Sequence, residues 1–176
     1  GVIEIAGTLT KRGSSLSRAS SLVALQRAVR TAARDPDIDA ILLRIDSPGG
    51  TVAGTQELAA EVKRASEAKP VYAYVDDLAA SAAYWIASQT ERIYANTPTA
   101  IVGSIGTFVG LYDYSAYAAK EGIRAVVIKA GALKAAGFPG TEITDEQKAY
   151  WQEIVDQTQE QFTAGVAAGR CRAVDE

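Results

Sequence analysis

Short apolar runs alternate with segments of helical spacing along most of the chain. Residues 40–46 are almost entirely apolar, and residues 70–75 form a second run of this kind. Strands with few polar positions are typical of a parallel sheet that is covered on both faces. Between the two runs, Leu58 and Val62 lie one helical turn apart. Repeated strand–helix–strand units predict an α/β fold with a mainly parallel sheet and helices on both faces.

The same patterns assign the rest of the chain to a few further elements. Strands are predicted at residues 2–6, 92–95 and 123–129, and helices at residues 22–34, 114–120 and 145–168. Residues 101–106 form a tight apolar segment bracketed by glycines. Residues 7–17, rich in glycine, serine and basic side chains, predict a surface loop. We find no internal repeat and no linker, so residues 1–176 are predicted to form a single domain.

Charge and composition narrow the range of partners. The chain has 18 Lys and Arg against 21 Asp and Glu, a net charge of -3. This balance gives no basic footprint for nucleic acid or for a membrane surface. No apolar run approaches the roughly 20 residues of a membrane span. Methionine is absent even from position 1, which favours a fragment of a longer chain whose flanking segments carry any membrane anchor or capsid context.

The absence of histidine limits the available chemistry. A Ser-His-Asp triad, a Cys-His pair and a metal held by histidine are all excluded. The single cysteine, Cys171, cannot form an internal disulfide. No cofactor and no metal site are predicted, and any general base must be a residue other than histidine.

Ser81 stands where an apolar strand meets an apolar helix, within a group of small residues. A serine at such a turn can present its hydroxyl in a cleft, next to the unpaired amides of the first helical turn. That arrangement suits a nucleophile beside an anion site. The alternative is that Ser81 is only an N-cap. Asp76 and Asp77 precede the predicted helix, and a capping or dipole role is favoured for them over a catalytic one.

Gly49 and Gly50 follow directly on the apolar strand at 40–46. The carboxyl ends of parallel strands meet at one edge of the sheet, so the two glycines and Ser81 are expected to lie together. Glycine lets the backbone approach a ligand closely. An amide of this turn and the amide of Ala82 would then form an oxyanion hole. The alternative is a plain turn between a strand and a helix.

Four motifs together resemble one family over almost the whole chain. They are Asp46-Ser47-Pro48-Gly49-Gly50, Ala79-Ala80-Ser81-Ala82-Ala83-Tyr84, Val102-Gly103-Ser104-Ile105-Gly106 and Gly131-Ala132-Leu133-Lys134. In order and spacing they are similar to those of the signal peptide peptidase A family, which includes phage head-maturation proteases. Members of that family are serine peptidases with the Clp-protease/crotonase fold, so the resemblance implies that fold here.

The resemblance also implies a Ser-Lys catalytic dyad. Ser81 matches the nucleophile, Lys134 the general base, and Ser104 a hydroxyl that helps hold the lysine. The chain departs from the usual pattern because Ala82 and Ala83 replace two glycines after the nucleophile. In this respect it looks more like the phage-type and shorter bacterial members. The two alanines imply a tighter pocket floor, which affects substrate preference and not the hydrolytic role.

A lysine base has a physical requirement that the sequence can be checked against. The ordinary pKa of lysine is about 10.4, so a lysine accepts a proton near neutral pH only when burial disfavours its charged form. Lys134 lies among alanine, glycine and leucine, with no carboxylate within seven residues in the sequence. Burial of Lys134 is therefore expected. Lys129, at the end of a predicted strand, is the other candidate, and the remaining lysines have polar or charged neighbours.

These inferences converge on a serine endopeptidase that cleaves extended or unfolded polypeptides, such as signal peptide remnants or phage scaffold and capsid proteins. Two alternatives remain open. One is a crotonase-like acyl-CoA enzyme, and the other is a non-catalytic assembly subunit in which Ser81 and Lys134 are structural remnants. Because the relatives form rings, a homo-oligomeric ring is expected, in which the helix at 145–168 presents the Lys134 loop to a neighbour.

Overall fold

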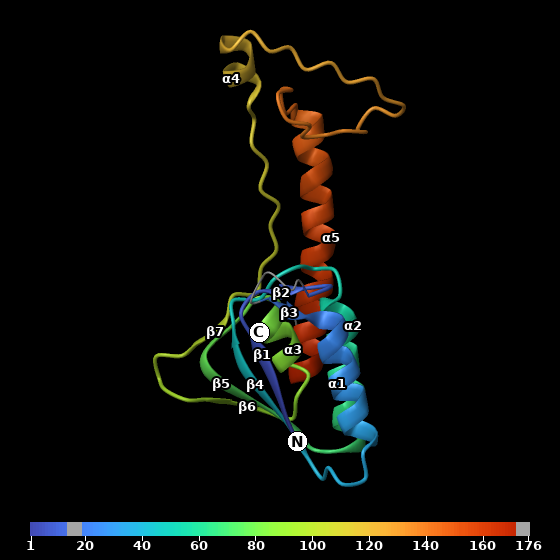
Figure 1. Ribbon diagram of the computed structural model, residues 1–176, viewed down its shortest axis with the longest axis vertical. Helices are drawn as coiled ribbons and strands as arrows, with labels where there is room; N and C mark the ends of the chain where they lie inside the picture. The colour runs from blue at the N-terminus through green and yellow to red at the C-terminus, as the bar shows by residue number, and fades with distance from the viewer. Residues whose placement is uncertain (14–18, 172–176) are drawn as a thin grey trace. The chain divides into compact units, whose positions relative to one another are not determined.

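The computed structural model describes residues 1–13 and 19–171 (Figure 1), so residues 14–17 of the predicted loop lie outside it. The chain forms two compact units. The first contains Gly1–Gly106 and the chain from Gln161 onward, and the second is Thr107–Glu160. The prediction of a single domain over residues 1–176 stays a prediction, because units of this kind also occur within single domains.

A parallel sheet organises the first unit (Figure 1). Its strands are β1 (Val2–Ala6), β4 (Ile41–Ser47), β5 (Val71–Ala80), β6 (Arg92–Ala95) and β7 (Ile101–Gly103). They are ordered β1-β4-β5-β6, and β7 pairs with the distal part of β5. All of these pairings are parallel. The predicted α/β fold with a mainly parallel sheet flanked by helices is therefore confirmed.

Helix α1 (Leu22–Arg34) follows its sequence pattern closely. Its buried residues are Leu22, Leu25, Val29 and Ala32, which are the residues that recur at helical spacing. Ser21 caps the first turn by accepting a hydrogen bond from the Ala24 amide at 3.3 Å. The helix ends before Asp35-Pro36, because proline disfavours helical backbone at the residue before it.

Helices α1, α2 (Thr55–Ala68) and α3 (Ala82–Ala87) lie on the same side of the sheet in Figure 1. Along β4, Ile41, Leu43 and Ile45 are fully buried, whereas Arg44 and Asp46 are exposed. The expectation of helices on both faces is therefore wrong for this unit. The reason is visible in the strand itself, since charged residues occupy alternate positions and face away from the helices.

Two further expectations about the first unit are corrected. The predicted loop contains β2 (Leu9–Thr10), which pairs in parallel with β3 (Ser20–Ser21). Leu9 is completely buried, and one apolar residue in a polar segment was too weak a signal to predict this strand. Asp76 and Asp77 belong to β5, which continues to Ala80. Asp76 accepts from Arg44 Nε at 2.8 Å, so its role is a cross-strand ion pair.

The second unit contains α4 (Ser115–Lys120) and the first part of α5 (Asp145–Arg170). Thr144 accepts from the Gln147 amide at 3.3 Å and so caps the first turn of α5. The strand predicted at residues 123–129 is not formed. This segment pairs with no strand of the described residues, and Ile128 is 97% exposed. Alternating apolar residues alone do not make a strand without a partner.

The last turns of α5 pack within the first unit. The Phe162 ring stacks on Trp85 with a centroid separation of 5.0 Å, and both side chains are buried. Gln89 Nε2 donates to the Gly165 carbonyl at 2.9 Å. Within the described part of α5, the buried residues are Phe162 and Val166, whereas Ile154 and the other apolar residues nearer the start of the helix stay partly or fully exposed.

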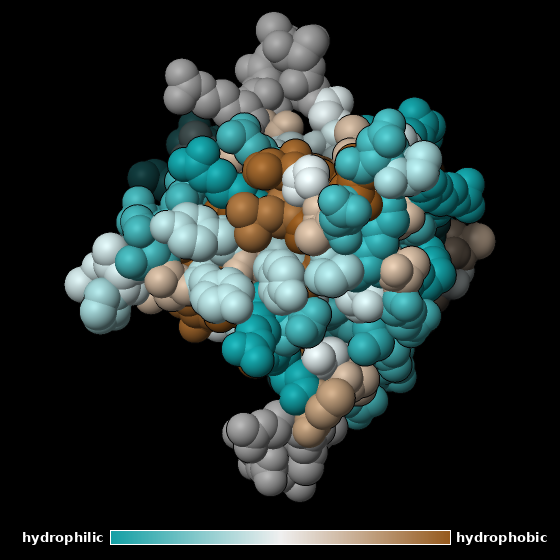
Figure 2. All heavy atoms as spheres, turned by 90° about the horizontal axis from the view of Figure 1, so that it is seen from below, coloured by the Kyte–Doolittle hydropathy of each residue, from teal (hydrophilic) through white to brown (hydrophobic). Residues whose placement is uncertain are grey.

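The exposed apolar side chains are unevenly distributed along the chain. On the face drawn in Figure 2, hydrophilic surface surrounds a limited apolar area. Of the described residues, large apolar side chains are exposed mainly between residues 105 and 128. They are Ile105, Phe108, Val109, Tyr112, Tyr114, Tyr117, Ile123, Val126 and Ile128. Among the helices at 1–13 and 19–171, none is long and apolar enough to span a bilayer.

A buried carboxylate joins α1 to α2. Glu61 is 6% exposed and accepts from Arg30 at 2.5 Å and from Arg64 at 2.6 Å. The hydrogen bond from Arg30 is the main cause that lowers the pKa of Glu61, while burial opposes it. The two arginines are about half exposed, so solvent screens the pairing from one side.

We predict that Glu61→Gln lowers the free energy of unfolding by about 1–2 kcal/mol at neutral pH, a value reduced for the exposure of the arginines. The folded-state pKa of Glu61 is lowered, so its contribution is present above the ordinary glutamate pKa of about 4.3 and is lost as pH falls through the lowered value. Denaturant unfolding of both proteins across that range measures the difference. Glu67→Gln, at an exposed position on the same helix, is the control. Equal losses in the two variants would contradict the assignment.

Candidate active site

Ser81 occupies a strained turn between β5 and α3. Its backbone has φ 53° and ψ -125°, a conformation that is unusual for any residue other than glycine. The Ser81 amide donates to the Gly103 carbonyl at 2.8 Å, and its carbonyl accepts from the Trp85 amide at 3.0 Å. Ser81 stands at the N-cap position of α3, but its side chain makes no capping hydrogen bond, so the alternative that it serves only to cap the helix is wrong. A strained serine on a sharp strand-to-helix turn is the backbone arrangement that exposes a nucleophilic hydroxyl.

The Gly49 backbone lies directly against this turn, as expected from the shared sheet edge. A Cβ atom built on Gly49 would lie 2.7 Å from the Ala80 carbonyl oxygen, 2.8 Å from Ser81 Cβ and 2.9 Å from the Ala82 amide nitrogen. Gly49 also has φ +92°, which disfavours any side chain. The structure therefore brings the glycine turn and Ser81 into contact, and the contact leaves no space for a side chain at position 49.

Hydrogen bonds distinguish the two glycine amides. The Gly49 amide donates to Ser47 Oγ at 3.1 Å. The Gly49 carbonyl accepts from the Leu9 amide at 2.8 Å, and the Leu9 carbonyl accepts from the Thr51 amide at 2.9 Å. Because a trans peptide directs its N–H opposite to its C=O, the Gly50 amide points away from Leu9 and takes no part in this bridge.

The Ala82 amide is a second donor without a backbone acceptor in its own helix. Ala82 is the first residue of α3, and the first amides of a helix have no intrahelical partner. Gly50 could not carry a side chain, since a Cβ there would lie 1.9 Å from the Leu9 carbonyl oxygen. Since the Gly49 amide donates to Ser47, the Gly50 and Ala82 amides stay the candidates for the predicted oxyanion hole.

Ser104 emerges beside Ser81 at the same sheet edge. Ala80 of β5 is paired with Gly103 of β7, so the next residue of each strand lies at the carboxyl end of the ladder. Ser104 also has a positive φ, 54°, and its side chain is exposed. The structure therefore brings together Ser81, Ser104 and the glycine turn within the first unit.

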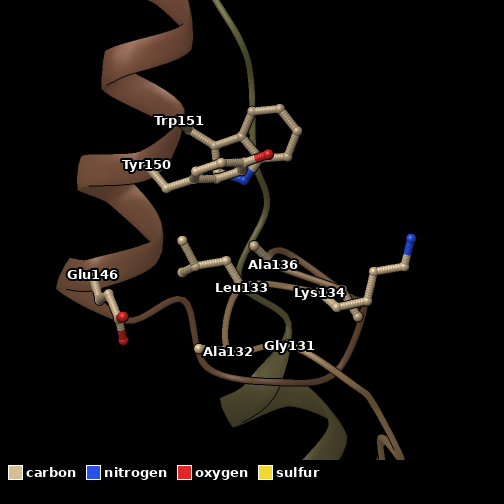
Figure 3. Close-up of a pocket in the computed structure, with 9 residues that line it drawn as sticks. Gly131, Ala132, Leu133, Lys134, Ala136, Glu146, Tyr150 and Trp151 are labelled. Carbon is tan, nitrogen blue, oxygen red and sulfur yellow. The ribbon is translucent and has the colours of Figure 1, made fainter.

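Lys134 lies in the second unit, in a loop of consecutive turns. Its amide donates to the Gly131 carbonyl at 3.3 Å, and Ala135 has φ 69°. The loop lines a pocket with residues of α5 (Figure 3), and in that view Leu133 points toward Tyr150 and Trp151 while the Lys134 side chain extends away from them.

The expected burial of Lys134 is not found in this unit, where its side chain is exposed. The physical reason is the size of its neighbours. Alanine and glycine keep charge away from a lysine but do not cover its long side chain, and the larger Leu133 is directed elsewhere. A desolvated amine would need cover from residues outside the immediate loop.

The other lysines with partners are less suitable as free amines. Lys129 Nζ donates to the Ala132 carbonyl, and Lys69 Nζ donates to the Ala32 carbonyl at 3.2 Å. Lys148 pairs with Asp145 at 2.8 Å, which raises the pKa of this lysine. Among the residues at 1–13 and 19–171, no hydrogen-bond acceptor is found for Lys134 Nζ, so Lys134 is favoured over Lys129.

One residue of the site was missed by the sequence interpretation. Ser47 is fully buried and holds the Gly49 amide. Its signal was the alternation of β4, because position 47 continues the inward series of Ile41, Leu43 and Ile45 with a polar side chain. A polar residue at a core position needs a hydrogen-bond partner, which is a reason to examine it.

The arrangement corresponds to a known class of fold. The structure is similar to a mutant of the 1510-N membrane-bound stomatin-specific protease in complex with a substrate peptide, with a TM-score of 0.51, 24% identity and coverage of 63% of this chain and 47% of that chain. It is also similar to a mutant of ClpP1 from Listeria monocytogenes, with a TM-score of 0.51, 12% identity and coverage of 99% and 74%. At these identities the likeness shows the fold alone, which is that of the Clp-protease class.

The family follows from the sequence comparisons. The model of peptidase family S49 matches residues 63–176. The chain is 34% identical over 170 residues to capsid assembly protease C of Escherichia phage lambda, covering 95% of this chain and 38% of that protein. It is 29% identical over 177 residues to the chloroplastic serine protease SPPA of Arabidopsis thaliana, covering 99% and 25%. The chain belongs to peptidase family S49, and it spans less than half the length of either relative named here.

Proposed function

We propose that this chain is the catalytic part of a serine endopeptidase with Ser81 as nucleophile and Lys134 as general base. The observation that carries the proposal is the strained Ser81 turn, with the Gly49 backbone packed against Ser81 and the Ala82 amide. Membership of a peptidase family supports the reaction type. An acyl-CoA enzyme would need carboxylates at the cleft, and Asp76, on the strand that leads to Ser81, is paired with Arg44.

The reaction follows from these roles. The Ser81 hydroxyl attacks the carbonyl carbon of the scissile peptide while its proton passes to the neutral Lys134 amine. The resulting oxyanion is held by the Gly50 and Ala82 amides. Collapse of this intermediate breaks the C–N bond, and the lysine returns the proton to the leaving amine. Water then hydrolyses the acyl-enzyme by the same route, and Ser81 is regenerated.

For this chemistry the Lys134 amine must reach Ser81 and lose its water. Ser104, which emerges beside Ser81, is the hydroxyl proposed to hold the amine in place. The Lys134 loop has three glycines with positive φ, Gly131, Gly137 and Gly140, so its backbone can adopt turns that other residues resist. We infer that the loop closes over this amine in the active state and removes it from water.

The proposed substrates are extended or unfolded polypeptides. A peptide that lies along a sheet edge must be in an extended conformation, which a stably folded protein cannot offer. A relative is named as a capsid assembly protease, and the motifs resemble the signal peptide peptidase family. Phage scaffold or capsid proteins and signal peptide remnants are therefore the substrate classes that we propose.

We also propose that the chain acts as a homo-oligomeric ring. The segment between residues 105 and 128 exposes many large apolar side chains, including Phe108 at 91% and Ile128 at 97%. Exposed apolar surface of this kind marks interaction sites. Residues 123–129 in addition have the alternating pattern of a strand without a partner in the described chain, which favours pairing with a neighbouring subunit.

We predict that Ser81→Ala and Lys134→Ala each abolish hydrolysis of an unfolded protein substrate while the protein stays folded. The two residues form one proton-transfer unit, so losing either costs nearly as much as losing both, on the order of 10³-fold or more. Lys134→Arg is expected to be equally inactive, because a guanidinium does not deprotonate in this range. Substrate cleavage is measured beside circular dichroism.

Lys129→Ala is the matched control for the dyad. It removes a lysine from the same loop region whose amine already donates to a backbone carbonyl. This variant is expected to keep most of its activity. Full activity of a folded Ser81→Ala or Lys134→Ala protein would contradict the dyad. Loss of activity only in Lys129→Ala would identify Lys129 as the general base.

Activity is predicted to rise with pH through a limb above neutrality. A lysine base works only as the neutral amine, and the chain has no histidine to produce a limb near the ordinary histidine pKa of about 6.5. Initial rates with one peptide substrate measure the profile. A flat profile between about pH 6 and about pH 9 would argue against lysine. Chelators are expected to leave the rate unchanged, since the proposed proton transfers require no metal.

Assembly is predicted to depend on the exposed segment. Light scattering at micromolar concentration should give a multiple of 18.5 kDa, and Ile128→Lys should reduce the mass because a charge replaces an apolar contact. Val52→Lys is the control, since Val52 is also exposed but lies in the first unit. A mass near 18.5 kDa for the unmodified protein, or equal effects of the two variants, would count against this surface.

A further inference from the structure

Ser47 combines complete burial with two hydrogen bonds to backbone groups. It is 0% exposed at the last position of β4. Its hydroxyl donates to the Gly7 carbonyl at 2.6 Å and accepts from the Gly49 amide at 3.1 Å. One side chain therefore connects the end of β1 to the glycine turn. Removal of the hydroxyl would take a hydrogen-bond partner from both backbone groups, and a buried polar group without a partner lowers the stability of the fold.

The groups that Ser47 connects are themselves held from other directions. The Gly7 amide donates to the Asp46 carbonyl at 2.9 Å, which fixes Gly7 beside β4. The Gly49 carbonyl accepts from the Leu9 amide at 2.8 Å. Gly49 is thus held at its amide by Ser47 and at its carbonyl by Leu9. The direction of the next amide, that of Gly50, follows from these two contacts.

The position of Gly49 in turn controls the space around Ser81. Its Cα approaches so closely that a Cβ would lie within 3 Å of the Ala80 carbonyl, Ser81 Cβ and the Ala82 amide. A small displacement of Gly49 would therefore change the separation between the Gly50 amide and the oxygen that forms at Ser81. Oxyanion stabilisation is sensitive to such changes, since it acts through short, aligned hydrogen bonds.

We propose that Ser47 is a positioning residue for the oxyanion hole. Its hydroxyl occupies the Gly49 amide and holds the Gly49–Gly50 peptide so that the Gly50 amide faces the reacting carbonyl. In this role Ser47 acts through its two hydrogen-bond partners, the Gly7 carbonyl and the Gly49 amide. The inference rests on the proposed peptidase function and goes beyond it by assigning a residue that acts only through the geometry of the glycine turn.

The test compares Ser47→Ala with the matched control Ser88→Ala in the full chain. Ser88 is also 0% exposed, and its hydroxyl likewise donates to a backbone carbonyl, that of Trp85 at 2.7 Å, and accepts from Gln89 Nε2 at 2.8 Å. It lies at the far end of α3 from Ser81. Both substitutions remove a satisfied buried hydroxyl, but only the first removes it from the glycine turn.

The readouts are kcat and KM for a fluorogenic peptide and the affinity of a peptide aldehyde, which forms a tetrahedral adduct. Ser47→Ala is expected to lower kcat about 10–100-fold, with KM within about twofold, because the oxyanion contact strengthens only in the transition state. Aldehyde affinity should fall in parallel. Ser88→Ala should leave both quantities within about threefold of the unmodified protein.

Each outcome decides the proposal. If Ser47→Ala behaves like Ser88→Ala, or if its loss is confined to KM, the positioning role is overturned. Should Ser47→Ala fail to fold, Ser47→Thr retains the hydroxyl, and a kcat near that of the unmodified protein supports the role while a full loss overturns it. Absence of hydrolysis in the unmodified protein, or its survival in Ser81→Ala, refutes the proposed function itself, so the two failures are distinct.

Discussion

The contact between the Gly49 backbone and the Ser81 turn is the constraint on which the candidate site depends. It exists because β4 and β5 are parallel neighbours, so that both strands end at the same edge of the sheet. The shift in register between Ile45 and Ser47 brings Ser47 opposite Ala79, one residue before Ala80 and two before Ser81. The positive φ of Ser81 is maintained by its bond to Gly103 on the other side. A strained residue persists only where the surrounding structure holds it, and here strands on both sides do so.

The two halves of the proposed chemistry have different structural support. The nucleophile and the amide donors stand on a sheet whose inward side chains are fully buried, with Val71, Ala73 and Val75 each at 0% exposure. Lys134 stands on a loop of turns with small side chains. Oxyanion stabilisation needs a rigid frame, whereas a base needs to lose water only when substrate is present.

Much of the first unit could be predicted from sequence because its signals are local. The buried face of α1 and the junction at Ser81 follow from helical spacing and small residues. The prediction that helices cover both faces of β4 was wrong. It treated the strand as one apolar run and overlooked Arg44 and Asp46, which are exposed at alternate positions. Asp76 was placed before a helix because nothing in its own neighbourhood shows that β5 continues to Ala80 beside β7. These errors concern pairing partners, which are distant in sequence.

The second unit was harder to predict for the same reason. The alternation at residues 123–129 indicates a strand, but a strand forms only with a partner, and the described chain supplies none. The prediction that Lys134 is buried combined the family resemblance with its uncharged neighbours in sequence, and those neighbours are too small to cover it. Ser47 was missed because the motif Ser47-Pro48-Gly49-Gly50 drew attention to its glycines, although the inward position of Ser47 was available from alternation.

The most direct test of the central claim is to locate the activated serine chemically. A fluorophosphonate reacts with a serine whose hydroxyl is activated for attack, and tandem mass spectrometry of the digested protein identifies the modified residue. A single adduct on Ser81, lost when the protein is denatured before labelling, is the result that this account predicts. An adduct on another serine such as Ser104, or no adduct on the active preparation, would contradict it.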